Sequence, residues 1–135
     1  MAQSVPILVV EDEALVLLDV EACLEDGGYT VLTASNGREA IQLIERRLAD
    51  IRALISDIDI GSGDISGWDI ARMAREGKAD LPVVYMTGAS TAQWTSQGVP
   101  NSILLPKPFA MAQLIAAVSN LLNASAEVLK APDAG

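Results

Sequence analysis

The chain has 135 residues, and its 9 lysines and arginines against 18 acidic residues give a formal net charge of −9 at neutral pH. A negative charge of this size repels phosphate backbones and anionic membrane surfaces, so we expect neither nucleic-acid nor membrane binding. The absence of histidine excludes a Ser-His-Asp triad and a histidine-ligated zinc site within these residues.

The remaining counts are typical of one globular domain, since 50% of the residues are hydrophobic and 20% are charged. Cys23 is the only cysteine and cannot form a disulfide within the chain. No apolar run reaches the roughly 18 residues of a membrane span, and the N-terminus lacks the basic start of a signal peptide. We therefore expect a cytoplasmic domain over residues 1–123 and a flexible C-terminal tail over 124–135.

The first third of the chain alternates short apolar runs with amphipathic segments. Residues 7–10 are a continuous run of Ile, Leu and Val, which is typical of a strand covered on both faces of a parallel sheet. A helix is predicted next, from three apolar residues at helical spacing: Leu15, Leu18 and Ala22. It ends at Gly27, and a second strand is predicted over 29–34. Asn36 can cap the following helix, with Glu39 three residues further on.

The same alternation continues to the end of the chain. In order, the remaining predicted elements are a strand at 52–56, a helix at 68–76, a strand at 82–86, a short weak helix at 89–97, a strand at 102–105 and a helix at 110–123. Strands that alternate with helices in this way predict a doubly wound α/β domain with a five-stranded parallel sheet and five helices. Ligands of such sheets bind beyond the carboxyl ends of the strands.

Polar residues follow four of the five predicted strands. Glu11 and Asp12 follow the first strand, Asp57 the third, Thr87 the fourth and Lys107 the fifth. Two carboxylates about 4 Å apart repel by roughly 4 kcal/mol at an effective dielectric constant of 20, so three together require a cation. An oxygen-only ligand set without histidine or cysteine is typical of Mg²⁺ or a similar hard ion.

This set of residues can perform phosphoryl chemistry. A carboxylate beside a hard cation can attack phosphorus and hold an aspartyl phosphate, while an ammonium and a hydroxyl contact the phosphoryl oxygens. Lys107 is the only charged residue between positions 81 and 126, and a buried ammonium needs a partner. The competing interpretation is that each polar residue only caps a helix, which explains the residues singly but not their joint placement.

Four motifs in this order resemble the signature positions of a response regulator receiver domain. They read ILVVEDE at 7–13, LISD at 54–57, MTGA at 86–89 and KPF at 107–109. The resemblance covers about residues 5–123, and the spacings of 30 residues from Asp57 to Thr87 and 20 from Thr87 to Lys107 make it specific. It implies a flavodoxin-like sheet with strand order 2-1-3-4-5.

The resemblance also implies a role for each site residue. Asp57 would be the phosphoacceptor. The Mg²⁺ or Mn²⁺ ligands would be Glu11, Asp12, Asp57 and the backbone carbonyl of Asp59. Thr87 would be the switch hydroxyl and Lys107 its ion-pair partner, followed by a cis peptide bond between Lys107 and Pro108.

As a receiver, the chain would be a signalling module and not a turnover enzyme. The resemblance implies phosphorylation by a sensor histidine kinase or a histidine phosphotransfer protein, slow self-dephosphorylation, and an output through an unknown downstream protein. A homodimer through the fourth helix, fifth strand and fifth helix is a further option. Because this stretch carries almost no charge, a hydrophobic or heterotypic contact is the expected form.

The sequence departs from the receiver pattern at two places. Leu104 stands where the family has its switch aromatic, so Tyr85, Trp94 or Phe109 either substitutes for that residue or serves only in packing. The loop after Asp57 lacks the common Met-Pro and is longer than usual. Its glycines, at positions 61, 63 and 67, indicate either a mobile lip over the acceptor or ordinary turns. Trp94 lies in the weak fourth helix, where its side chain either forms part of a surface that binds a partner or is simply buried.

Two other functions remain open at this level. Asp57 and Asp59 after an apolar strand imitate the nucleophile and the acid/base pair of a haloacid dehalogenase-type phosphatase, although Glu11 and Asp12 have no place in that pattern. A pseudo-receiver that binds partners without phosphorylation is the other possibility. The complete set of acidic, hydroxyl and lysine residues counts against it.

Overall fold

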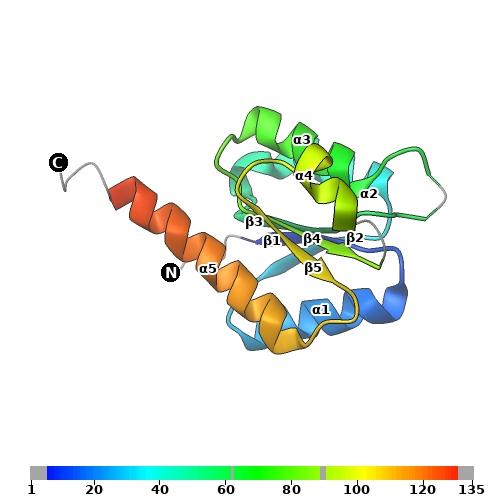
Figure 1. Ribbon diagram of the computed structural model, residues 1–135, viewed down its shortest axis with the longest axis horizontal. Coiled ribbons are helices and arrows are strands. Elements are labelled where there is room, and N and C mark those ends of the chain that lie inside the picture. The colour runs from blue at the N-terminus through cyan, green and yellow to red at the C-terminus, as the bar shows by residue number, and fades with distance from the viewer. Residues whose placement is uncertain (1–5, 62, 89–90, 131–135) are drawn as a thin grey trace.

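The computed structural model describes residues 6–61, 63–88 and 91–130, with the backbone alone for 91 and 124–130. A five-stranded sheet forms the centre of the molecule, with strand order β2-β1-β3-β4-β5 and parallel pairing throughout (Figure 1). The strands are β1 (Ile7–Val10), β2 (Val31–Ala34), β3 (Ala53–Asp57), β4 (Val83–Thr87) and β5 (Ser102–Pro106). The predicted doubly wound α/β fold and the strand order are both confirmed.

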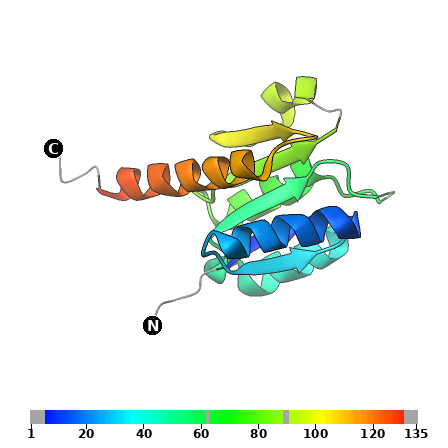
Figure 2. The same ribbon diagram turned by 90° about the horizontal axis from the view of Figure 1, so that it is seen from below.

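Helices cover both faces of the sheet. They are α1 (Ala14–Asp26), α2 (Gly37–Arg47), α3 (Gly67–Gly77), α4 (Trp94–Gln97) and α5 (Met111–Lys130), with 3₁₀ turns at Leu48–Asp50 and Thr91–Gln93. The α2, α3 and α4 helices lie on one side of the sheet, and α1 and α5 lie on the other (Figures 1 and 2). The result is a three-layer sandwich.

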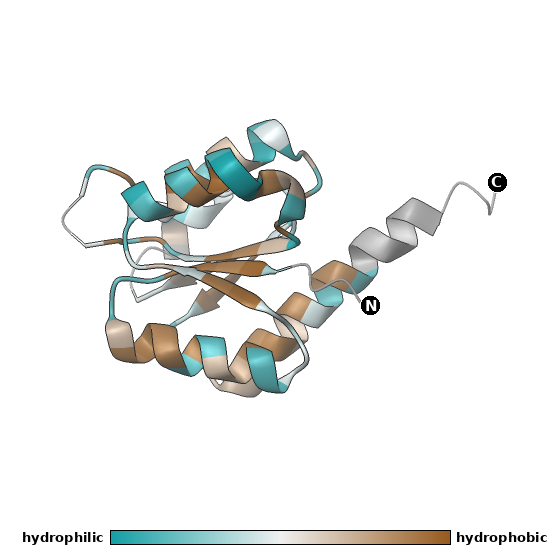
Figure 3. Cartoon of the chain, turned by 180° about the vertical axis from the view of Figure 1, so that it is seen from behind, coloured by the Kyte–Doolittle hydropathy of each residue, from teal (hydrophilic) through white to brown (hydrophobic). Residues whose placement is uncertain are grey.

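Alternation of side chains along each strand divides the core between the two faces. Leu8, Leu54 and Tyr85 belong to the cluster with α2 and α3, while Ile55 and Met86 belong to the cluster with α1 and α5. Figure 3 shows the strands as a hydrophobic layer between the helices, with hydrophilic residues on the α2 and α3 side and many hydrophobic residues along α1. Since both faces are covered, the strands need no polar alternation, as the sequence of β1 predicted.

The buried side of α1 differs from the prediction. The helix forms as expected, but Leu15 and Leu18 are 78% and 58% exposed, and Ala22 is exposed as well. Val20 and Leu24 are buried instead and pack in the cluster with α5. Apolar residues occur all around this helix, so helical spacing alone could not identify the side that faces the sheet.

The helix starts follow local capping signals. The Asn36 side chain accepts a hydrogen bond from the backbone N–H of Glu39 at 2.9 Å, and Glu39 accepts one from the backbone N–H of Ser35 at 2.7 Å. The predicted Asn36–Glu39 helix start is therefore confirmed. At the start of α3, Ser66 and Asp69 form a complete capping box, in which Asp69 accepts from the backbone N–H of Ser66 itself.

Two helix boundaries differ from the prediction. The α5 helix ends at Lys130 and not near Asn123, because no proline or glycine interrupts the sequence before Pro132. Residues 131–135 of the predicted tail lie outside the described residues. The predicted weak helix at 89–97 is a 3₁₀ turn followed by the four-residue α4, and positions 89–90 also lie outside the description. Within the described ranges, no helix is long and apolar enough to cross a membrane.

Candidate functional site

Three carboxylates gather at the carboxyl ends of β1 and β3. Oxygen atoms of Glu11, Asp12 and Asp57 all lie within 4.8 Å of one another. The register pairs Val10 with Ser56, so the residues that follow them, Glu11 and Asp57, reach the same edge of the sheet. Glu11 and Asp57 are buried, whereas Asp12 is exposed. The predicted acidic cluster is therefore present, with one carboxylate open to solvent.

Lys107 enters this cluster from the end of β5. Its Nζ lies 2.9 Å from Glu11 Oε1 and 3.3 Å from Asp57 Oδ2. Its backbone N–H donates to the carbonyl of Thr87 at 2.6 Å, and the peptide bond to Pro108 is cis, as predicted. The lone lysine of a long uncharged stretch thus has two carboxylate partners, one of them 96 positions earlier in the chain.

Glu11, Asp12, Asp57 and Lys107 form an acidic pocket, and this environment shifts the pKa of two of its groups. Burial raises the pKa of Asp57 to about 6, and the charge of Glu11 adds to this effect while Lys107 opposes it. Burial lowers the pKa of Lys107, but the hydrogen bond to Glu11 and the charge of Asp57 outweigh burial, so this pKa lies above its ordinary value. Lys107 therefore stays protonated, and Asp57 is a carboxylate held in an environment of excess negative charge.

Thr87 and Asp59 are the two remaining residues of the predicted site. Thr87 is fully buried at the end of β4, one position beyond Met86, which is the register partner of Asp57. Asp59 follows Asp57 with an exposed side chain, between the buried Ile58 and Ile60. The switch role of Thr87 and the ligand role of the Asp59 carbonyl stay predictions.

Leu104 and the three aromatic candidates occupy different environments. Leu104 is half-buried on β5 beside the cluster with α3, and its register partner on β4 is Tyr85, which is fully buried. Trp94 is 36% exposed at the start of α4, so it is not simply buried. Phe109 packs on the opposite side of the sheet, against the cluster with α1 and α5.

Gly67 supports the acceptor in a way that sequence reasoning missed. It is the first residue of α3 and not part of the loop, and a Cβ placed there would overlap the backbone carbonyl of Asp57. Its N–H donates to the carbonyl of Ile58 at 2.8 Å. The Ser66-x-x-Asp69 pattern before an apolar run could have located this helix start. Gly61 has a φ of +59°, the left-handed conformation that favours glycine, which agrees with the turn interpretation at that position.

The chain is similar to known signalling proteins over nearly its whole length. The family model of the response regulator receiver domain matches residues 7–119. The transcriptional regulatory protein CusR of Escherichia coli K12 is 33% identical over 125 residues, which are 91% of this chain and 53% of CusR. The chain thus spans about half the length of the curated relatives it matches.

Solved structures of receiver domains have the same fold. A response regulator receiver protein from Sinorhizobium medicae superposes with a TM-score of 0.86 at 45% identity, over 90% of this chain and 97% of that one. A receiver domain protein from Clostridium thermocellum gives 0.78 at 26% identity, over 91% and 98%. Receiver domains are not turnover enzymes, so the phosphatase alternative is set aside. With its 2-1-3-4-5 sheet, its acidic pocket and a family match over most of its length, the chain belongs to the response regulator receiver domains.

Proposed function

We propose that the chain accepts a phosphoryl group on Asp57 from a histidine kinase or a histidine phosphotransfer protein and thereby signals to a protein partner. The observation that carries this proposal is the placement of the Asp57 carboxylate, which lies beside two further carboxylates and 3.3 Å from the ammonium of Lys107. Phosphoryl transfer to a carboxylate requires these groups: the accepting carboxylate, oxygen ligands for a cation beside it, and a positive charge for the phosphoryl oxygens.

The chemistry of the pocket fits a divalent cation. Glu11, Asp12 and Asp57 offer only carboxylate oxygens, and the single positive charge of Lys107 leaves an excess negative charge among them. Oxygen donors with excess negative charge suit Mg²⁺ or Mn²⁺, and the backbone carbonyl of Asp59 would be a further ligand. When bound, the ion neutralises charge on the carboxylates and on the incoming phosphoryl group.

The side chains of the pocket would divide the transfer step among them. An oxygen of Asp57 forms a bond to phosphorus while the bond from phosphorus to the donor's imidazole nitrogen breaks, and the electron pair of that bond stays on the imidazole. Lys107 neutralises one phosphoryl oxygen, and the hydroxyl of Thr87 donates to another. Self-dephosphorylation is the slow attack of water on the same phosphorus.

This chemistry indicates which kinds of protein would act as partners. Because these 135 residues contain no histidine, the phosphohistidine that donates the group must lie outside them. A downstream protein, or a second copy of this chain, then recognises the phosphorylated state. Residues 1–123 would form the signalling unit. A pseudo-receiver would not need the acidic cluster and the lysine together, which favours phosphorylation over that alternative.

The experiment is intact mass spectrometry after incubation with acetyl phosphate and Mg²⁺. We expect the unmodified chain to gain the mass of one phosphoryl group, and Asp57→Asn to gain none. Asp59→Asn is the matched control, because this exposed carboxylate lies two residues away and its backbone carbonyl is retained, so its adduct should persist. An unchanged adduct yield in Asp57→Asn would contradict the proposal.

A further inference from the structure

Tyr85 places an aromatic ring one strand away from the position where receiver domains have their switch aromatic. It lies on β4, and its register partner on β5 is Leu104, which stands at that position. Register partners on neighbouring parallel strands point to the same face of a sheet, as do residues two apart on one strand. The ring of Tyr85 and the side chain of Thr87 therefore share the face that carries α3 and α4.

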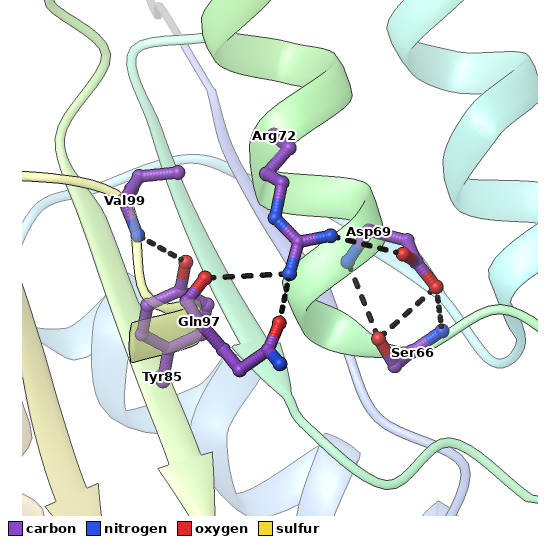
Figure 4. A network of polar contacts seen from close by, with 6 residues as sticks. All are labelled: Ser66, Asp69, Arg72, Tyr85, Gln97 and Val99. Carbon is purple, nitrogen blue, oxygen red and sulfur yellow. Dashed lines mark hydrogen bonds and ion pairs between the residues drawn. The ribbon is translucent and has the colours of Figure 1, made fainter. Parts of the chain in front are cut away.

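The hydroxyl of Tyr85 connects β4 to the segment that leads from α4 to β5. It accepts a hydrogen bond from the backbone N–H of Val99 at 3.0 Å (Figure 4). The ring lies against Trp68 of α3, with centroids 4.7 Å apart and planes inclined at 59°. Because Tyr85 is fully buried between these contacts, the ring cannot move without displacing Val99 or Trp68.

A second polar contact holds the end of α4 to α3. The guanidinium of Arg72 donates to the side-chain carbonyl of Gln97 and to its backbone carbonyl, and it is oriented by Asp69 at 3.3 Å (Figure 4). Trp94 Nε1 donates to Ser102 Oγ at 2.9 Å across the same segment. None of the four residues of α4 is buried, so these polar contacts, and not core packing, hold the helix in place.

The described residues 91–99 lead back to β4, where the N–H of Val99 donates to the hydroxyl of Tyr85. Thr87, the predicted switch hydroxyl, is the last residue of β4, two positions beyond Tyr85. A shift of Thr87 towards a phosphoryl group on Asp57 would displace the end of β4 and with it the ring that holds Val99. Leu104 has no donor or acceptor in its side chain with which to hold Val99.

We infer that Tyr85, through its hydrogen bond to Val99, transmits the phosphorylation state of the Asp57 pocket to α4 in place of an aromatic residue at position 104. The inference rests on the proposed function. Tyr85 is a positioning residue here, since its hydroxyl contacts Val99 and not the phosphoryl group. In the unphosphorylated state the bond holds α4 near β4, and phosphorylation weakens it.

The test compares Tyr85→Phe with the unmodified chain by amide NMR, with and without beryllofluoride and Mg²⁺. The substitution keeps the ring against Trp68 and removes only the hydroxyl. Tyr29→Phe is the matched control, because that hydroxyl contacts Ser119 at 3.1 Å, on the α1 and α5 side of the sheet. In the unmodified chain and in Tyr29→Phe, beryllofluoride should shift amides near Asp57 and also those of residues 94–99.

In Tyr85→Phe the shifts near Asp57 should remain and those of residues 94–99 should be lost. Hydrogen exchange at the Val99 amide of free Tyr85→Phe should be several-fold faster, which shows that the bond was removed. Full beryllofluoride shifts at residues 94–99 in Tyr85→Phe, or their loss in Tyr29→Phe as well, would overturn the inference and leave the phosphoacceptor proposal standing. No shift near Asp57 in the unmodified chain would overturn both.

Discussion

Lys107 lies between the two buried carboxylates of the pocket, within 2.9 Å of Glu11 and 3.3 Å of Asp57. A cation in this position reduces the repulsion between them, but one positive charge does not balance three carboxylates. Burial raises the pKa of Asp57 to about 6, and the charge of Glu11 adds to this effect. The carboxylate that is costly to ionise in the free protein is thus the one whose charge a bound divalent cation would neutralise.

The cost of ionising Asp57 predicts the effect of Asp57→Asn on stability. Because the folded-state pKa of about 6 lies above the ordinary 3.8, the stability that protonation gives is complete below pH 3.8 and is lost as the pH rises through about 6. Without divalent ions at about pH 7.5, Asp57→Asn should therefore be more stable than the unmodified chain by about 1–2 kcal/mol, since the lost contact with Lys107 limits the gain.

Urea denaturation in EDTA at two pH values checks this prediction. The difference in unfolding free energy between Asp57→Asn and the unmodified chain should shrink as the pH approaches 4. At that pH the carboxyl group of Asp57 is protonated and is therefore as uncharged as the amide that replaces it. Asp59→Asn, an exposed substitution, serves as the control and should shift stability little at either pH. A variant Asp57→Asn that is less stable than the unmodified chain near neutral pH would show that ionised Asp57 is not a burden on the fold.

At the scale of the element, α1 places its apolar residues on two sides. Val20 and Leu24 face the sheet, while Leu15 and Leu18 face solvent. Both pairs fit a helical spacing, so the position of the sheet decides which pair contributes to the core. The α1 helix begins at Ala14, two residues after Asp12 of the acidic pocket. Leu15 and Leu18 therefore lie on the helix that directly follows this pocket in the chain.

Two leucine-to-alanine substitutions separate the sides of α1. Leu24→Ala should lower the free energy of unfolding by about 2–5 kcal/mol, because it leaves a cavity among buried side chains. Leu18→Ala removes the same atoms from a side chain that is 58% exposed and should cost less than about 1 kcal/mol. Chemical denaturation of both variants measures the difference, and similar losses would mean that α1 presents another side to the sheet.

At the scale of the whole molecule, the pocket exists only when the sheet is assembled. Its carboxylates come from β1 and β3 and its lysine from β5, strands that are far apart in the chain. A cation that binds this pocket therefore binds the folded state and not the unfolded chain, and it stabilises the fold by mass action.

Mg²⁺ should accordingly raise the midpoint of thermal unfolding. At a concentration 100 times its dissociation constant, the gain in unfolding free energy is about 2.7 kcal/mol. Asp12→Asn should abolish most of this gain, because it removes the exposed carboxylate of the cluster. Glu13→Gln is the matched control, since it neutralises the next acid along the chain, which is exposed and lies outside the cluster, and it should retain the gain. Equal loss in both variants would indicate a general charge effect.

The sequence by itself determined the fold class, the strand order through the family resemblance, and the residues of the acidic pocket. The fold class follows from local alternation and the pocket residues from their places at the strand ends, whereas the strand order is what the resemblance implies. Only the tertiary structure decided that Val20 and not Leu18 is buried, that Gly67 must lack a side chain beside Asp57, and that Tyr85 reaches Val99. Each of these depends on the register and packing of segments distant in the chain, which no pattern within a segment encodes.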